Sequence, residues 1–304
     1  MICSLRQTRS SPMRKARPVL RAGVAAAALL VAAAPLAGQE ADWTEVRARR
    51  QADGIQSVSV DVEYVAGELR VAAAEGGLLY DTHLRYDAAR MKPERKWSVE
   101  GNVARLDIGF EGLGEDGDLN IEFEGDDHGF LQLGLSPDVP TDLRLKVGAA
   151  QSEVELGGIP LTGLVYQTGA SETKLNFGSV NPVQMKRLEL AVGVAEFRAT
   201  ALGNARFEEF EFQGGLGDVE LDFTGDWSRN ASATIEMGLG TLTLVMPEDL
   251  GVRISKAGFL AALDAPGFTK VDGAWQSPGW DSASHHLDVR LRAALGSIEV
   301  RQAH

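Results

Sequence analysis

The phrase VGAAQSEVEL at residues 147–156 returns four more times, as TGASETKLNF (168–177), VGVAEFRATA (192–201), GGLGDVELDF (214–223) and MGLGTLTLVM (237–246). Its glycine recurs at steps of 21, 24, 22 and 23 residues. Self-similarity at a fixed period of this length is typical of a chain that stacks one small unit upon the next. The sequence therefore predicts a repeat architecture. The repeated glycines are Gly148, Gly169, Gly193, Gly215 and Gly238.

Apolar side chains flank each of these glycines with even spacing, five and three places before it and six and eight places after it. Alternate residues of a β-strand face the same way, whereas a helix would repeat at three and four. Each unit is therefore predicted to be strand, corner, strand. Before the glycine the pairs are Leu143/Leu145, Leu164/Tyr166, Leu188/Leu190, Phe210/Phe212 and Ala233/Ile235; after it they are Val154/Leu156, Leu175/Phe177, Ala199/Ala201, Leu221/Phe223 and Leu244/Met246.

The corner glycines are expected to adopt positive φ, which glycine reaches without a Cβ clash. A similar apolar frame fits two outlying segments, and in the second of them Ala294 stands in place of the glycine. At least seven rungs result, more than the three or so that a repeat protein needs. We predict an all-β fold: a parallel β-solenoid of about seven or more rungs of 21–24 residues with a short N-terminal cap. The two outlying frames are Val60, Val62, Leu69 and Val71, and Val289, Leu291, Ile298 and Val300.

The first 38 residues have the pattern of a bacterial-type secretory signal peptide. Six basic and no acidic residues accompany an apolar run at residues 22–34, which is too short to cross a bilayer of about 30 Å. Gln39 stands where a lipoprotein would carry its lipid-bearing cysteine. We therefore predict an unanchored mature chain without a transmembrane helix, located in the periplasm or outside the cell.

Acidic residues dominate the composition. The net charge is −13, and removal of residues 1–38 would leave 24 basic and 43 acidic residues, a net charge of −19. Such a surface argues against nucleic acid and anionic lipid as partners. The single cysteine, Cys3, lies in the segment to be removed, so a disulfide, a thiolate metal site and a cysteine nucleophile are all excluded from the mature chain.

The chain divides by pattern into four segments. We assign residues 1–38 to the signal peptide, 39–54 to an N-terminal cap or linker, 55–142 to an irregular β region, and 143–304 to the solenoid with an insertion at 259–284; residues 55–304 are read as one continuous domain. Trp43, Val46 and Arg50 share a helical spacing, so a helix is expected to cap the first rung. Further strands are expected at residues 79–86, 97–99, 103–110 and 119–123.

Several of these phrases resemble the toast-rack family of exported bacterial β-solenoids. They are GELRV (67–71), GLSPDVP (134–140), TGASETKLNF, MGLGTLTLVMPEDLGV (237–252) and AALGSIEV (293–300). That family is related to the C-terminal domain of the cell-envelope stress protein LiaF and to adhesin-like domains of unknown function. The resemblance implies a solenoid that acts through its surface, and it supplies no catalytic residues to carry over.

The rung alignment places three carboxylates in one row, on three successive rungs. Glu172, Glu196 and Asp218 each stand three places after the glycine, so they could stack at the strand spacing of about 4.8 Å. Oxygen-rich clusters attract Ca²⁺, which makes these residues weak candidates for metal ligands; a solvated acidic edge is the favoured interpretation. Two places further on, Glu153, Lys174, Arg198 and Glu220 are expected to compensate one another and to specify register.

Sequence motifs for nucleotide, zinc or serine-hydrolase chemistry are absent. Two turns combine acids with histidine, one at Asp126, Asp127 and His128 and one at Asp281, His285 and His286. Asp and Gly gather in turns for backbone reasons alone, as they do at residues 115–118, so we assign neither catalytic nor cofactor-binding residues there.

We therefore expect a non-enzymatic exported solenoid that serves as a cell-envelope interaction, scaffold or adhesin-like protein. Its partner would be a protein or another envelope component. A polysaccharide-acting β-helix enzyme and a calcium-dependent binding module stay open as alternatives, both through Glu172, Glu196 and Asp218. A homo-oligomer formed by end-to-end stacking also stays open.

Overall fold

The computed structural model describes residues 41–112, 128–257 and 261–303, which lie in one compact unit, Glu40–His304. The predicted signal peptide, the turn at residues 115–118, the strand at 119–123, and Asp126 and Asp127 lie outside the described residues. Within the described part, strands form a single 16-stranded sheet, and one short 3-10 helix, Leu202–Ala205, interrupts them. No helix in that part is long and apolar enough to cross a membrane.

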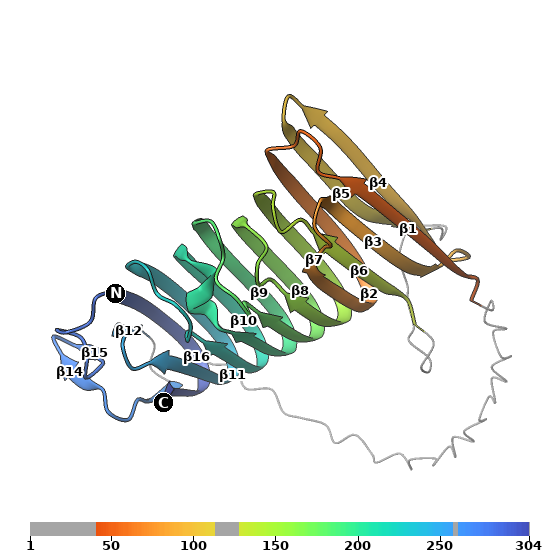
Figure 1. Ribbon diagram of the computed structural model, residues 1–304. Helices are drawn as coiled ribbons and strands as arrows, with labels where there is room; N and C mark the ends of the chain where they lie inside the picture. The colour runs from red at the N-terminus through yellow and green to blue at the C-terminus, as the bar shows by residue number, and fades with distance from the viewer. Residues whose placement is uncertain (1–40, 113–127, 258–260, 304) are drawn as a thin grey trace, which may run out of the picture. The chain divides into compact units, whose positions relative to one another are not determined.

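Seven long strands form the repeat and pair in parallel, each with the next (Figure 1). This confirms the predicted all-β solenoid and its rungs. Leu188 pairs with Leu164 on one side and Phe210 on the other, as the alignment about the glycines requires. The rung strands are β2 (Ser57–Ala73), β7 (Thr141–Glu155), β8 (Leu161–Asn176), β9 (Met185–Thr200), β10 (Phe207–Asp222), β11 (Ala231–Pro247) and β16 (His286–Ala303).

Each rung strand changes the phase of its side chains at the corner. In β9, Val192 and Ala195 are both buried, while Gly193 is half-buried and Val194 is exposed. The ladder between β8 and β9 likewise passes from Val192 to Val194 without pairing Gly193. Two successive residues, Gly193 and Val194, thus lie outside the core, as at a β-bulge. The core lies within the bend, between the two halves of each strand.

The expectation of positive φ at the corner glycines is wrong. Gly193 and Gly215 are not among the residues with positive φ, whereas Gly217 and Gly240, two places beyond the corner, are. The corner requires glycine because the neighbouring rung comes close: a β-carbon on Gly215 would lie 2.5 Å from the carbonyl oxygen of Gly193. Tight stacking, and not a left-handed backbone, explains the repeated residue.

At the N-terminal end of the stack, two sets of strands continue the two halves of β2. Its first half pairs with β5 (Val103–Gly112), which pairs with β4 (Met91–Glu100). Its second half pairs with β6 (Phe130–Leu135), followed by β3 (Leu78–Asp87) and β1 (Trp43–Gln51). Expected strands at residues 79–86, 97–99 and 103–110 thus lie within β3, β4 and β5.

The predicted N-terminal helix is wrong, because residues 43–50 belong to the strand β1. Val46 pairs with Leu84 in antiparallel register, and the guanidinium of Arg85 lies 4.4 Å from the ring centre of Trp43. Three residues at helical spacing are weak evidence in a segment this short, and pairing with β3 supplies backbone hydrogen bonds that a lone helical turn would lack.

At the C-terminal end, β12 (Gly251–Ala257) and β13 (Ala261–Asp264) both pair in parallel with β16. β12 follows the first half of β16 and β13 follows its second half, so together they extend the stack by another rung. β15 (Ala274–Gln276) then pairs with β12, and β14 (Thr269–Val271) with β15, both in antiparallel register. These two short strands lie within the segment expected to be an insertion.

Candidate functional site

An open groove of about 1230 Å³ runs along the corner of the stack, from β2 to β16. Its lining includes the whole column of corner glycines, which contribute backbone atoms alone. A groove that crosses successive rungs is built from equivalent positions of the repeat, so its features fall into rows. The glycines that line it are Gly148, Gly169, Gly193, Gly215 and Gly238.

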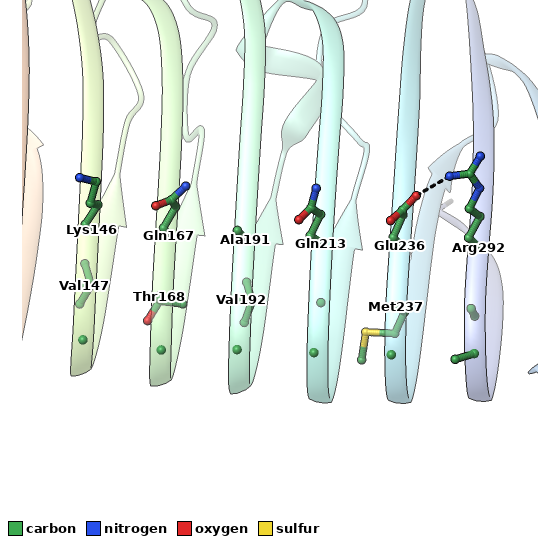
Figure 2. A pocket seen from close by; sticks show the side chains of 18 of the residues that line it. Lys146, Val147, Gln167, Thr168, Ala191, Val192, Gln213, Glu236, Met237 and Arg292 are labelled. Atoms are coloured by element: carbon green, nitrogen blue, oxygen red, sulfur yellow. Dashed lines mark hydrogen bonds and ion pairs between the residues drawn. The ribbon is translucent and has the colours of Figure 1, made fainter.

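The first row is polar and electrically balanced. Figure 2 shows Lys146, Gln167, Ala191, Gln213, Glu236 and Arg292 in line across successive strands. Lys146 Nζ donates to Glu63 Oε1 at 2.6 Å, and Arg292 Nη1 donates to Glu236 Oε1 at 2.7 Å. The hydrogen bond to Glu63 also raises the pKa of Lys146. Both cations of this row are therefore neutralised, and its middle presents side-chain amides.

The second row, next to the first in Figure 2, carries Val147, Thr168, Val192 and Met237. These side chains are buried. At the equivalent place β10 has Gly214, where an added β-carbon would lie 2.5 Å from the sulfur of Met237. Met237 therefore fills the space that this glycine leaves, and the row closes the floor of the groove with apolar atoms and one hydroxyl.

Several hydroxyl groups lie within the core beside this row. Tyr166 and Thr173 share a hydrogen bond of 2.9 Å, and Thr173 Oγ1 donates to Ser171 at 3.2 Å. Burial raises the pKa of Tyr166, and the nearby hydroxyls of Ser152, Thr173 and Thr168 offset part of that rise. The hydroxyls of Ser152 and Thr168 nevertheless meet no hydrogen-bond partner of suitable geometry among the described residues. They are local weak points of the core.

An aliphatic ridge follows the glycine column on the outside of the corner. We use this name for Val194, Leu216, Leu239 and Leu295, which directly follow the corner position and are exposed by 57%, 44%, 43% and 50%. They pair in register on four consecutive strands, β9, β10, β11 and β16. A contiguous row of exposed aliphatic side chains makes this ridge a candidate interaction surface.

An acidic row lies two residues beyond the ridge. Glu172 pairs in register with Glu196, and Glu196 with Asp218, which confirms the predicted alignment; all three are exposed. Lys174 Nζ lies 3.7 Å from Glu172, whereas Glu196 and Asp218 make no ion pair with any described residue. No group of three or more His, Cys, Asp or Glu residues in the described ranges is placed to hold a metal ion. Calcium binding here stays an open alternative.

The predicted charge ladder beyond the acidic row forms only in part. Arg198 Nε lies 3.5 Å from Glu220 on the next rung. Glu153 instead pairs with Arg70 on β2, at 3.7 Å. Lys174 and Arg198 are neighbours of like charge. These exposed pairs contribute little to stability.

The two histidine-containing turns show no catalytic arrangement in the described residues. His128 lies 3.8 Å from Glu68, and the other residues of its turn are not described. In the second turn the ring of His286 packs edge-on against Trp280, and its Nε2 lies 3.0 Å from the carbonyl oxygen of Trp280. A histidine held in this way by its own turn is structural.

Neither the ridge nor the groove was predicted from the sequence. The apolar frame of the repeat does not include the residue after each glycine, and a simple alternation gives no reason to place Val194 or Leu216 outside the core. The available signal was the residue after each glycine, which is Ala149 and Ala170 in the early repeats and becomes Val or Leu in the later ones. The phase change at the corner turns that position outward.

Comparisons with known proteins point to one family. The model described as the N-terminal domain of toast_rack, DUF2154, matches residues 38–198, more than half of the chain. No curated protein matches. A solved structure from Clostridium sporogenes with a proposed cell-adhesion role is 18% identical, with a TM-score of 0.47 over 86% of this chain and 100% of that one. A proposed adhesin from Bacteroides fragilis is 10% identical, with a TM-score of 0.26 over 84% of this chain and 97% of that one.

Proposed function

The chain belongs to the toast-rack family, and from this membership and the geometry of its corner we propose that it is a non-enzymatic binding protein of the cell envelope. In this proposal the solenoid is a rigid scaffold or adhesin-like module, and its partner docks on the groove and the aliphatic ridge. The other rung surfaces only support that site.

The observation that carries this proposal is the exposure of the aliphatic ridge. Val194 and Leu216 lie on neighbouring strands and are exposed to solvent, whereas most other large aliphatic side chains of these strands are buried. Exposed apolar area costs free energy in water, and a partner that covers it recovers roughly 25 cal/mol per Å². The groove beside the ridge offers concave backbone surface for the same partner.

The chemistry of the groove favours binding over catalysis. Its ionisable lining consists of two ion pairs, Glu63 with Lys146 and Glu236 with Arg292, and the buried Tyr64. General acid–base catalysis requires a titratable group that is within reach of the substrate and able to exchange protons near neutral pH. Groups already held in pairs are poor candidates for that role.

Export is the second part of the proposal. It is supported by the basic and apolar pattern of residues 1–38 and by the acidic composition of the remaining chain. A periplasmic or extracellular location would bring the corner into contact with envelope components.

Co-sedimentation with purified cell envelopes tests the proposed function. The wild-type protein is compared with a ridge variant, Leu216→Ser with Leu239→Ser, and with a control variant, Val99→Ser with Val103→Ser. The control valines are 43% and 54% exposed but lie on β4 and β5, away from the ridge. We expect the ridge variant to lose most of the bound fraction and the control variant to bind as the wild type does.

Either of two results would overturn the proposal. One is equal binding by the ridge variant and the wild type. The other is a defined turnover of an envelope glycan that disappears in Glu196→Gln, because such an activity would establish the enzymatic alternative through the acidic row.

A further inference from the structure

We propose that the segment which docks on this corner is a cationic amphipathic α-helix of a partner protein, and that it lies along the stack, across the rungs. Its aliphatic side chains would cover the aliphatic ridge, and its lysine or arginine side chains would face the acidic row. This inference rests on the proposed function and names the class of partner.

The distribution of charge argues for cations on one side of the partner. Glu196 and Asp218 stand two residues beyond Val194 and Leu216, a separation of about 7 Å along a strand. Glu172 continues the acidic row on β8, whereas Thr241 and Ser297 take this place beside Leu239 and Leu295. Glu196 and Asp218 have no ion-pair partner among the described residues. A partner that places cations beside them relieves repulsion between like charges on adjacent strands.

The opposite flank of the ridge calls for no charge. There the polar row of the groove pairs its own cations, Lys146 with Glu63 and Arg292 with Glu236, and presents Gln167 and Gln213 between them. A partner with charge on both flanks would leave one set of charges unmatched. Around Val194 and Leu216 the corner is thus apolar in the middle, acidic on one side and neutral on the other, which is the complement of a helix with one apolar face and one basic edge.

The spacing of the rungs favours a helix over an extended peptide. From Val194 to Leu295 the ridge crosses three strand intervals, or about 14 Å at roughly 4.8 Å each. Three turns of an α-helix advance about 16 Å, whereas three two-residue steps of an extended chain advance about 20 Å. A helix therefore keeps one aliphatic side chain near each rung over the length of the ridge.

The ridge strands β9, β10 and β11 offer no free sheet edge for strand addition. β9, β10 and β11 each have a parallel neighbour on both sides, and β16 pairs with β11 on one side and with β12 and β13 on the other. Along these ladders the backbone hydrogen-bonding groups are already paired, so a partner contacts the strands there through side chains. This requirement is met by a helix that lies over the ridge.

Binding of synthetic peptides to the full protein tests the inference. The first peptide has leucines at alternating spacings of three and four residues and lysines along one edge of the resulting apolar face. The second has the same composition in scrambled order, and the third has glutamates in place of the lysines. Fluorescence anisotropy gives the affinity of each, and circular dichroism reports whether the first becomes helical when bound.

We expect the first peptide to bind at least tenfold more tightly than either control peptide, to gain helicity, and to weaken as salt is added. Leu216→Ser with Leu239→Ser should reduce that affinity at least tenfold. Glu196→Gln with Asp218→Asn should reduce it severalfold and flatten its salt dependence, whereas Val99→Ser with Val103→Ser should change nothing.

Equal affinity for the scrambled peptide would overturn the inference, as would binding that is unaffected by the ridge variant. So would a dimer of this protein, or binding to uncharged phosphatidylcholine vesicles, that depends on Leu216 and Leu239, because a second copy or a lipid surface would then be the occupant. Ridge-dependent binding to envelopes without binding of the cationic peptide would reject the helix and leave the proposed function intact.

Discussion

A β-carbon added to Gly193 would lie 2.5 Å from the carbonyl oxygen of Gly169 on the preceding rung. The same relationship recurs one rung on, where a β-carbon on Gly215 would lie equally close to the carbonyl oxygen of Gly193. The missing side chain of each of these glycines thus lets two neighbouring rungs approach closely. The glycine recurs in the sequence because this close contact recurs from rung to rung. The parallel register on both sides of the corner depends on it.

Replacing Gly193 should therefore destabilise the fold. Forcing a side chain into a filled space typically costs about 1 to 3 kcal/mol of the free energy of unfolding; we expect Gly193→Ala to fall in that range and Gly193→Val to cost at least as much. Urea denaturation measures both. Gly109→Ala on β5 is the control, since a β-carbon there would meet no atom within 4 Å. An unchanged midpoint for Gly193→Val would contradict the close approach of the rungs.

Thr168→Val should stabilise the protein. The hydroxyl of Thr168 is buried and has no hydrogen-bond partner of suitable geometry among the described residues. Valine has nearly the same shape and suits a strand, and removal of an unpaired buried hydroxyl should add about 1 kcal/mol to the free energy of unfolding. Thr173→Val is the matched comparison, because Thr173 is hydrogen-bonded to Tyr166, and it should destabilise. Equal effects of the two substitutions would show that the Thr168 hydroxyl is bonded after all.

Tyr64 should make stability depend on alkaline pH. Burial raises the pKa of its hydroxyl well above the ordinary value, and the nearby backbone of Glu68 offsets part of this. Because the folded state disfavours the phenolate, the contribution of this group is fully present below the unfolded pKa of about 10 and is lost as the pH rises above it. The Tyr64 hydroxyl is also buried without a hydrogen-bond partner of suitable geometry among the described residues, so Tyr64→Phe should raise stability somewhat at neutral pH. It should also flatten the fall in melting temperature above pH 10. A fall of the same steepness in the variant would show that Tyr64 ionises in the folded state.

Glu196→Gln separates a repulsive acidic row from a calcium site. Without calcium, removal of the central charge between Glu172 and Asp218 should raise the free energy of unfolding by about 0.2 to 1 kcal/mol. Calcium should then leave the melting temperatures of both proteins unchanged. Calorimetric binding of Ca²⁺ to the wild type, lost in Glu196→Gln, would instead establish the metal site.

Much of the stack could be predicted because its pattern is local. Alternating apolar residues on both sides of a repeated glycine encode two strand halves, and the pairing of Leu188 with Phe210 follows from aligning the glycines. Residues 43–50 could not be predicted in the same way. Their secondary structure depends on pairing with β3, about thirty or more residues further along the chain. The edge of β3 supplies hydrogen-bond partners, so these residues form a strand despite their weak helical pattern.

The sequence by itself determined the rung, the period and the order of the stack, because side-chain alternation and repeat length are properties of the covalent chain. Only the tertiary structure decided why the corner needs glycine and which way Val194 and Leu216 face. Both depend on the bend of one strand against its neighbour: the bend brings the carbonyl oxygen of Gly169 against Gly193, and it turns Val194 and Leu216 out of the core. A surface formed by successive rungs exists only once the rungs are stacked. The groove and the ridge are therefore decided by the tertiary structure.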